Sequence, residues 1–151
     1  MEEGLLDAHA SVQAGMRGSL YGAEDIEVAQ GLGFTVLSTD ELRALGPKGY
    51  GELVLGKVGT RPVFVSFDID FLDPAFAPGT GTPEVGGFST AEALAFLRAL
   101  RGIKLAGCDV VQVSPPYDGP GRVTALAAAN FLDELLFLRA IGAAPCATPP
   151  A

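Results

Sequence analysis

Short apolar segments alternate with longer segments of helical pattern along most of the chain. The strand-like segments cover residues 11–16, 34–37, 62–67 and 103–113, the last centred on 107–113. The helix-like segments cover residues 23–31, 40–45, 50–58, 91–101 and 123–139. Strands that alternate with helices are typical of α/β folds, in which the sheet is mostly parallel. The pattern therefore predicts helices packed against a parallel sheet.

Local signals mark where several of these helices begin and end. Candidate N-caps are Ser38 or Thr39 before residues 40–45, and Ser89 or Thr90 before residues 91–101. These residue types accept hydrogen bonds from the free backbone N–H groups of a first helical turn. Gly46, followed by a proline, predicts an end to the helix at 40–45, so we expect residues 50–58 to form a separate helix.

The apolar strand at residues 62–67 is followed by three carboxylates, Asp68, Asp70 and Asp73. Aspartate is depleted in strands, so its presence here calls for a chemical reason. A spacing of two residues predicts that the side chains of Asp68 and Asp70 leave the strand on the same face. Two carboxylates held together repel unless a proton or cation neutralises them, and a hard divalent cation prefers oxygen ligands. We therefore expect a cation site here.

A second group of polar residues lies at or beyond the end of the next strand, namely Gln112, Ser114 and Asp118. In open parallel sheets, ligands bind in the crevice beyond the carboxyl ends of the strands. We therefore expect the loops that follow the two strands to face a common crevice.

Composition narrows the possible functions. The chain has 151 residues, 48% of them hydrophobic, which fits one globular domain, and its net charge of −8 argues against binding to nucleic acid or to an anionic membrane surface. The spacing of Cys108 and Cys146 matches neither a disulfide framework nor a zinc site, which favours the cytoplasm. Acidic residues interrupt the longest apolar helix, so we expect no membrane span. We expect residues 1–141 to form the domain and residues 142–151 a disordered tail.

The residues around the carboxylates resemble a known family. The stretch Ser-Phe-Asp-Ile-Asp-Phe-Leu-Asp-Pro at 66–74 and the Gly/Thr-rich loop at 78–87 are similar to the signature of the ureohydrolases, which include arginases and agmatinases. The resemblance extends to residues 15–21, 109–118 and 124–130, and the agmatinase branch is the most similar. It implies a three-layer α/β/α fold with a mostly parallel sheet, here truncated at the N-terminal side.

The resemblance also implies an activity and a set of site residues. Members of the family bind two manganese ions, activate a water molecule and hydrolyse a guanidino compound such as agmatine to release urea. By this resemblance Asp68 bridges the two ions and Asp70 binds one of them, while Ser66 and Asp73 support the site. The family also implies assembly into homo-oligomers.

Two further residues are candidates for substrate binding by resemblance. Thr82 is the best polar candidate in the Gly/Thr-rich loop. Gln112 stands where the family usually has a glutamate that contacts the guanidinium group. A glutamine of the same size can still accept a hydrogen bond from the guanidinium but lacks the charge. We expect weaker guanidinium binding than a glutamate gives.

The chain also departs from the family pattern. Further metal ligands of the family lie in a Gly-Gly-Asp-His segment and an Asp-Ala-His-x-Asp segment, and we expect this chain to correspond to the part that follows both. Asp7, Ala8 and His9 imitate the second segment, but Ser11 stands where its last aspartate belongs, so we interpret the match as coincidental. The alternative function is therefore a truncated, catalytically inactive member that binds metal weakly or only oligomerises.

Overall fold

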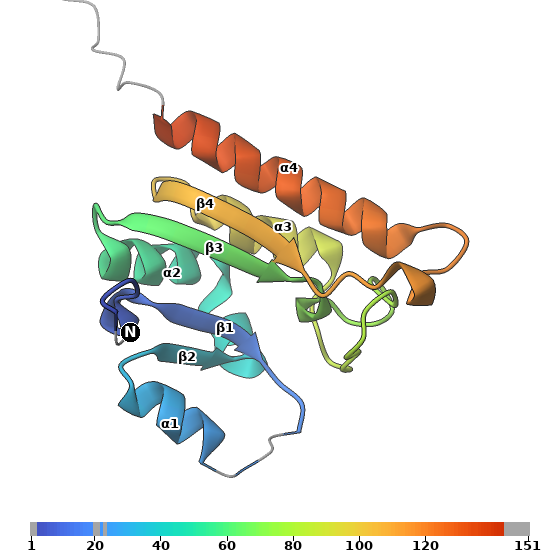
Figure 1. Ribbon diagram of the computed structural model, residues 1–151, viewed down its shortest axis with the longest axis horizontal. Coiled ribbons are helices and arrows are strands. Elements are labelled where there is room, and N and C mark those ends of the chain that lie inside the picture. The colour runs from blue at the N-terminus through green and yellow to red at the C-terminus, as the bar shows by residue number, and fades with distance from the viewer. Residues whose placement is uncertain (1–2, 20–21, 23, 144–151) are drawn as a thin grey trace, which may run out of the picture.

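The computed structural model describes residues 3–19, 22 and 24–143. The strands in these residues form two parallel pairs (Figure 1). Strand β1 (Val12–Met16) pairs with β2 (Thr35–Ser38), and β3 (Pro62–Asp68) pairs with β4 (Lys104–Val111). The prediction of parallel strands is confirmed, but within the described residues they form two separate two-stranded sheets, not one continuous sheet.

In the part of the chain that the structure describes, four α-helices follow or connect the strands. They are α1 (Asp25–Gly31), α2 (Thr39–Val58), α3 (Thr90–Ala99) and α4 (Val123–Ala143). The two predicted helices at 40–45 and 50–58 are the two halves of α2, which meet at a kink. Gly46 lies outside helical geometry there, with φ of 67° and ψ of 171°, a backbone conformation that glycine adopts without a steric penalty.

Helices α2 and α3 both begin with a capping box. In α2, the Ser38 hydroxyl accepts from the backbone N–H of Glu41, and the Glu41 carboxylate accepts from the backbone N–H of Ser38. Ser89 and Glu92 make the same reciprocal pair at α3. Each box satisfies backbone donors that a helix start leaves free, so both helices begin close to the predicted residue.

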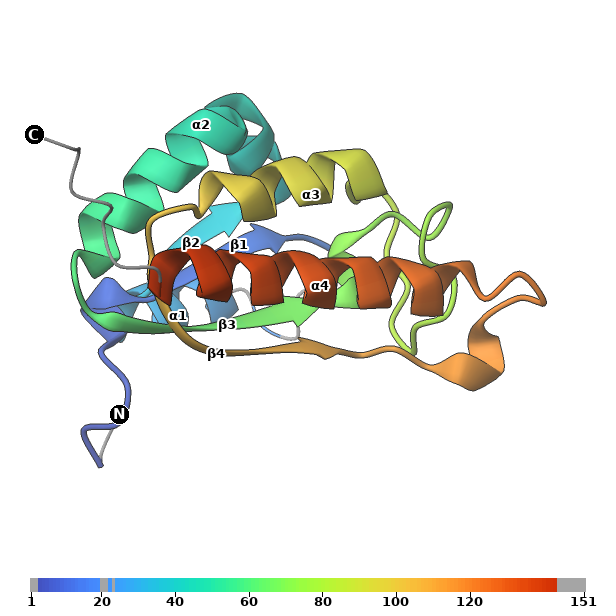
Figure 2. The ribbon, with the colours of Figure 1, turned by 90° about the horizontal axis from the view of Figure 1, so that it is seen from above.

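The hydrophobic core lies between the strands and the layer formed by α2, α3 and α4. Figure 2 shows these three helices on one side of β3 and β4. Along β3, Phe67 is buried and Val63 and Val65 pack against the core, whereas Phe64 is 63% exposed and Ser66 is also exposed. This alternation is the two-residue period of a strand with one covered face. Helix α4 contributes the buried apolar side chains of Ala127, Phe131, Leu135 and Leu138 to this core.

The C-terminal boundary differs slightly from the prediction. Helix α4 continues to Ala143, so the expected tail at 142–151 begins two residues too early. Residues 144–151 lie outside the described part of the chain. In the part that is described, no helix is both long enough and apolar enough to cross a membrane.

Candidate metal and substrate site

The predicted carboxylates meet at the carboxyl end of β3. The strand ends at Asp68 and continues into a 3₁₀ turn, Ile69–Phe71, in which the backbone N–H of Asp70 donates to Oδ1 of Asp68 at 3.1 Å. The Thr82 hydroxyl donates to Oδ2 of Asp70 at 2.9 Å. Three of the predicted site residues are therefore linked in one hydrogen-bonded cluster, here called the carboxylate cluster (Asp68, Asp70 and Thr82).

The geometric reason for this proximity differs from the one predicted. We expected Asp68 and Asp70 to leave an extended strand on the same face, but Asp70 lies in the 3₁₀ turn. Because β3 ends at Asp68, the two-residue period of the strand does not apply beyond it. The turn, closed by the hydrogen bond from Asp70 to Asp68, is what holds the two residues together.

The environment of Asp68 disfavours its charged form. The pKa of Asp68 is raised to about 6, first by burial and also by the nearby Asp70 carboxylate, and these effects outweigh the Asp70 N–H and the Arg17 guanidinium, which lower it. The raised pKa means that the positive charge and hydrogen-bond donors around Asp68 do not fully stabilise its ionised form. A bound cation supplies that charge, so the cluster suits a positively charged ligand.

Arg17, in the segment after β1, holds the loop that carries the cluster. Its Nη2 donates to the backbone oxygen of Asp70, to that of Leu72 at 3.1 Å and to that of Glu84 at 2.9 Å. These acceptors belong to two segments of the loop that are far apart in sequence. Sequence reasoning did not predict this contact with the turn, because nothing local links residue 17 to residue 70.

Asp73 closes the base of the same loop. Its Oδ1 accepts from the backbone N–H of Ala75 at 3.0 Å and its Oδ2 from that of Gly86 at 2.9 Å. The hydrogen bond from Ala75 is the largest of several influences that together lower the pKa of Asp73. At Gly87 a Cβ atom would lie 2.4 Å from the backbone nitrogen of Asp73, so a larger residue does not fit. The loop is thus held by its own backbone.

The loop after β4 is hydrogen-bonded to the Gly/Thr-rich loop, while the expected common crevice stays a prediction. The backbone N–H of Ser114 donates to the Gly79 oxygen at 2.7 Å, and the Gly79 N–H donates to the hydroxyl of Thr124 at 2.8 Å. Asp118 accepts from the first N–H groups of α4, those of Thr124 and Ala125. Burial pushes the pKa of Asp118 upward, but these hydrogen bonds outweigh it and the pKa is lowered.

Two predicted site residues, Ser66 and Gln112, make no hydrogen bond to the cluster in the described part of the chain. Ser66 is exposed on β3 and pairs in register with Asp109 of β4. Gln112 is exposed directly after β4 and has a φ of 62°, an uncommon conformation for a residue other than glycine. Among the described residues, no hydrogen bond connects either one to Asp68 or Asp70. Oδ1 of Asp109 is buried without a hydrogen-bond partner, and nothing in the sequence pointed to it.

The ligand atoms of the cluster are of the type that a divalent cation prefers, but there are too few of them to complete its coordination shell. Its donors are carboxylate and hydroxyl oxygens, which hard cations prefer. However, no three His, Cys, Asp or Glu side chains come together as a metal site anywhere in residues 3–19, 22 and 24–143. His9 is exposed in a 3₁₀ turn that precedes β1, whereas Asp68 is the last residue of β3. The interpretation of Asp7, Ala8 and His9 as a coincidental match stays a prediction.

The chain is similar in sequence to known proteins over most of its length. The model of the Arginase family matches residues 1–138. The chain is 49% identical to guanidinopropionase from Pseudomonas aeruginosa over 144 residues, which are 95% of this chain and 45% of that protein. It is 45% identical to agmatinase from Photorhabdus laumondii over 91% of this chain and 42% of that protein.

A solved structure shows the same fold. Proclavaminate amidinohydrolase from Streptomyces clavuligerus superposes with a TM-score of 0.87 at 45% sequence identity, covering 93% of this chain and 46% of that one. The expected three-layer α/β/α class agrees with this similarity. The chain spans less than half the length of each of these relatives.

Proposed function

Because the chain belongs to the arginase family, as the match over residues 1–138 shows, we propose that it provides part of a manganese site that hydrolyses a guanidino compound and releases urea. The observation that carries the proposal is the carboxylate cluster at the end of β3, where Thr82 holds Asp70 and Asp70 holds Asp68. Agmatine or a similar guanidino compound is the proposed substrate, by analogy with the relatives.

Asp68 and Asp70 are the residues that would hold the metal. When bound, divalent ions supply Lewis acidity and lower the pKa of water, so that hydroxide forms near neutral pH. The chain's own contribution is to fix the carboxylates: the Asp70 N–H holds one oxygen of Asp68 and Thr82 holds one oxygen of Asp70. The hydrogen bonds from Arg17 hold the backbone of the turn between them.

The charge of the site suits a guanidinium group. Two carboxylates in one turn create a negative potential, which attracts a cationic substrate toward the end of β3. Gln112 follows β4, the strand paired with β3, and its amide oxygen can accept a hydrogen bond from a guanidinium N–H. Ser66 and Asp73 are proposed to support the site, Asp73 through its hydrogen bonds to the loop backbone.

A second candidate function is metal binding without turnover. It is favoured by the small number of ligands, since the described residues offer two carboxylates and divalent cations of this type take six or more ligands. Activity then depends on ligands from another polypeptide. The two candidate functions differ in whether adding a polypeptide that carries the other metal ligands produces turnover.

We also propose that the protein self-associates and works in the cytoplasm. Exposed apolar side chains on α4, a common source of association, support the first part. They are Val123, Leu126, Leu132, Leu136 and Phe137. The free thiol of Cys108 suits a reducing compartment and supports the second part.

The test is urea release from agmatine and related guanidino compounds with added manganese. The chain is assayed alone and mixed with the portion of the Pseudomonas aeruginosa guanidinopropionase that lies outside the match. We expect turnover in the mixture, and at least a hundredfold loss of it in Asp68→Asn, because the carboxylate is a proposed metal ligand. Asp133→Asn, on the exposed part of α4, is the matched control and should leave turnover unchanged.

The possible results separate the candidates. Turnover in the mixture that Asp68→Asn does not reduce would overturn the proposed role of the carboxylate cluster. Manganese binding without turnover in any mixture would favour the second candidate.

A further inference from the structure

A buried phenylalanine directly after the Gly/Thr-rich loop packs on the turn of the carboxylate cluster. This residue, Phe88, is fully buried, and its ring stacks on that of Phe71 with the centroids 4.6 Å apart and an interplanar angle of 13°. Phe71 is the last residue of the 3₁₀ turn that contains Asp70. The backbone joins the same segments, because the Phe88 N–H donates to the Phe71 oxygen at 3.2 Å and the Asp73 N–H donates to the Phe88 oxygen at 2.9 Å. A displacement of Phe88 therefore displaces the turn.

Arg43, in the first half of α2, contacts the end of the loop in two ways. Its Nη2 donates to the backbone oxygen of Gly87 at 2.6 Å and to that of Gly86 at 3.2 Å. Its Cζ also lies 4.7 Å from the centroid of the Phe88 ring, which is a cation–π contact. The side chain forms no salt bridge with any residue that the structure describes. Its guanidinium is therefore committed to the loop and to the ring that follows it.

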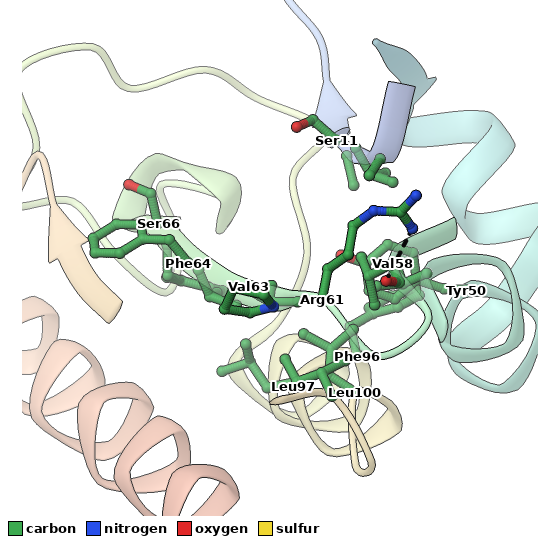
Figure 3. Close-up of a pocket in the computed structure, with 18 of the residues that line it drawn as sticks. Ser11, Tyr50, Val58, Arg61, Val63, Phe64, Ser66, Phe96, Leu97 and Leu100 are labelled. Carbon is green, nitrogen blue, oxygen red and sulfur yellow. Dashed lines mark hydrogen bonds between the residues drawn. The ribbon is translucent and has the colours of Figure 1, made fainter. Parts of the chain in front are cut away.

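Further aromatic side chains surround the stacked pair. Phe96 of α3 makes edge-on contacts with the rings of Phe71 and Phe88, at 6.3 Å and 5.2 Å between centroids, and a third with Tyr50 of α2 at 5.7 Å. An open groove of about 400 Å³ lies between β1 and β3, and Phe71, Phe96 and Tyr50 line it. Figure 3 shows Tyr50 and Phe96 approaching the groove from α2 and α3. Because Phe71 borders the groove, its position depends on its other contacts, the stack on Phe88 among them.

We propose that Arg43 is a positioning residue for the carboxylate cluster. Charge-assisted hydrogen bonds from its guanidinium fix the end of the Gly/Thr-rich loop, and its cation–π contact fixes the ring of Phe88. The stack of Phe88 on Phe71 passes this constraint to the turn that carries Asp70. The inference rests on the proposed function, because the role of the cluster in metal binding is itself proposed.

Amide hydrogen exchange of the full chain, measured without metal, tests this proposal. The N–H of Asp70 donates to Asp68 and that of Asp73 donates to Phe88, so both report on the turn and its attachment. Arg43→Ala should speed the exchange of these two amides by about tenfold or more, because local opening of the loop becomes easier. Arg43→Lys keeps the charge but lacks the planar group that stacks and donates, so it should recover little of the lost protection.

Ser38→Ala is the matched control for a general loss of stability. It removes the capping box of the same helix and leaves the guanidinium in place. The exchange of the Asp70 and Asp73 amides in this variant should stay within about twofold of the wild type. Equal acceleration by Arg43→Ala and Ser38→Ala, or no acceleration by Arg43→Ala, would overturn the proposal. Full protection in Arg43→Lys would mean that charge alone suffices, which contradicts the stacking contact that the proposal requires.

A manganese titration of the same variants gives a readout that a purely structural role would not move. Ligands held in a fixed arrangement bind more tightly than mobile ones, so Arg43→Ala should weaken the affinity read from NMR broadening at Thr82 by about threefold or more. Ser38→Ala should leave this affinity unchanged. Equal affinities of the wild type and Arg43→Ala would overturn the positioning role. If the wild-type chain shows no broadening, the proposed function fails, while the exchange measurement still decides whether Arg43 holds the turn.

Discussion

Asp68 is the residue whose environment most clearly calls for a ligand. Its pKa is raised from 3.8 to about 6, mainly by burial, so the folded chain holds this proton more tightly than the unfolded chain does. A group of this kind stabilises the fold below its unfolded pKa. That stability is lost as the pH rises toward the folded pKa. The metal-free protein therefore carries an unfavourable charge at neutral pH.

Asp68→Asn should remove this cost. In EDTA, we expect the free energy of unfolding of the wild-type protein to fall between about pH 4 and pH 6, and that of Asp68→Asn to change less. At pH 7 the variant should be more stable by about 1 kcal/mol, a value reduced for solvent screening because the side chain remains partly exposed. Urea denaturation from pH 4 to pH 8 measures this. A variant less stable than the wild type at pH 7 would contradict it.

Arg17 should stabilise the loop at residues 70–86 rather than the helices. Its hydrogen bonds reach the oxygens of Asp70, Leu72 and Glu84, and hydrogen bonds from a charged donor contribute about 1.5–3 kcal/mol. Arg17→Ala should lower the unfolding free energy by about 2 kcal/mol and speed amide exchange in residues 70–86. Arg101→Ala, at an exposed arginine after α3, is the control. If both variants behave alike, the proposed contact with the loop is wrong.

At the level of elements, helix starts were predictable because their signals are local. Ser38 and Ser89 were each one of two candidate caps, and the structure assigns the capping role to the serine in both cases. The kink in α2 was also signalled by Gly46, although the helix resumes immediately instead of ending. The pairing of strands was less predictable, since it depends on residues distant in sequence and on polypeptide that can lie outside this chain.

The capping box of α3 should contribute measurably to stability. Replacement of a serine N-cap by alanine costs about 1 kcal/mol, so Ser89→Ala should lower the unfolding free energy by that amount at pH 7. Hydrogen bonds from Ser89 lower the pKa of Glu92 below 4.5. The stability that the Glu92 carboxylate contributes is therefore present above pH 4.5 and is lost as the pH falls through the lowered pKa. The difference between wild type and variant should therefore shrink at pH 3. An unchanged difference would count against the box, and Thr60→Ala in an exposed turn serves as the control.

At the scale of the whole molecule, the sequence predicted the class of fold but not the contacts between distant segments. The residues of the carboxylate cluster could be named because their motif is continuous from 66 to 87. Contacts that join distant segments could not be named, and examples are the hydrogen bond from Arg17 to the Asp70 oxygen and the one from the Gly79 N–H to the Thr124 hydroxyl. The open groove between β1 and β3 also follows only from the three-dimensional arrangement.

Self-association is the expected behaviour of a molecule with these surfaces. Leu136 and Phe137 are 53% and 58% exposed on α4, and burial of such side chains between copies is favourable. Sedimentation velocity should show species larger than a monomer, and Leu136→Asp should shift them toward the monomer. A monomer at all concentrations would contradict the proposed oligomer.

Manganese titration followed by NMR is the most direct test of the central claim that the carboxylate cluster binds metal. Paramagnetic broadening of backbone amide signals should centre on Asp68, Asp70 and Thr82, with an affinity in about the millimolar range because the described residues offer few ligands. The double variant Asp68→Asn with Asp70→Asn should abolish it. Broadening that persists in the double variant, or that centres on another part of the chain, would contradict the account.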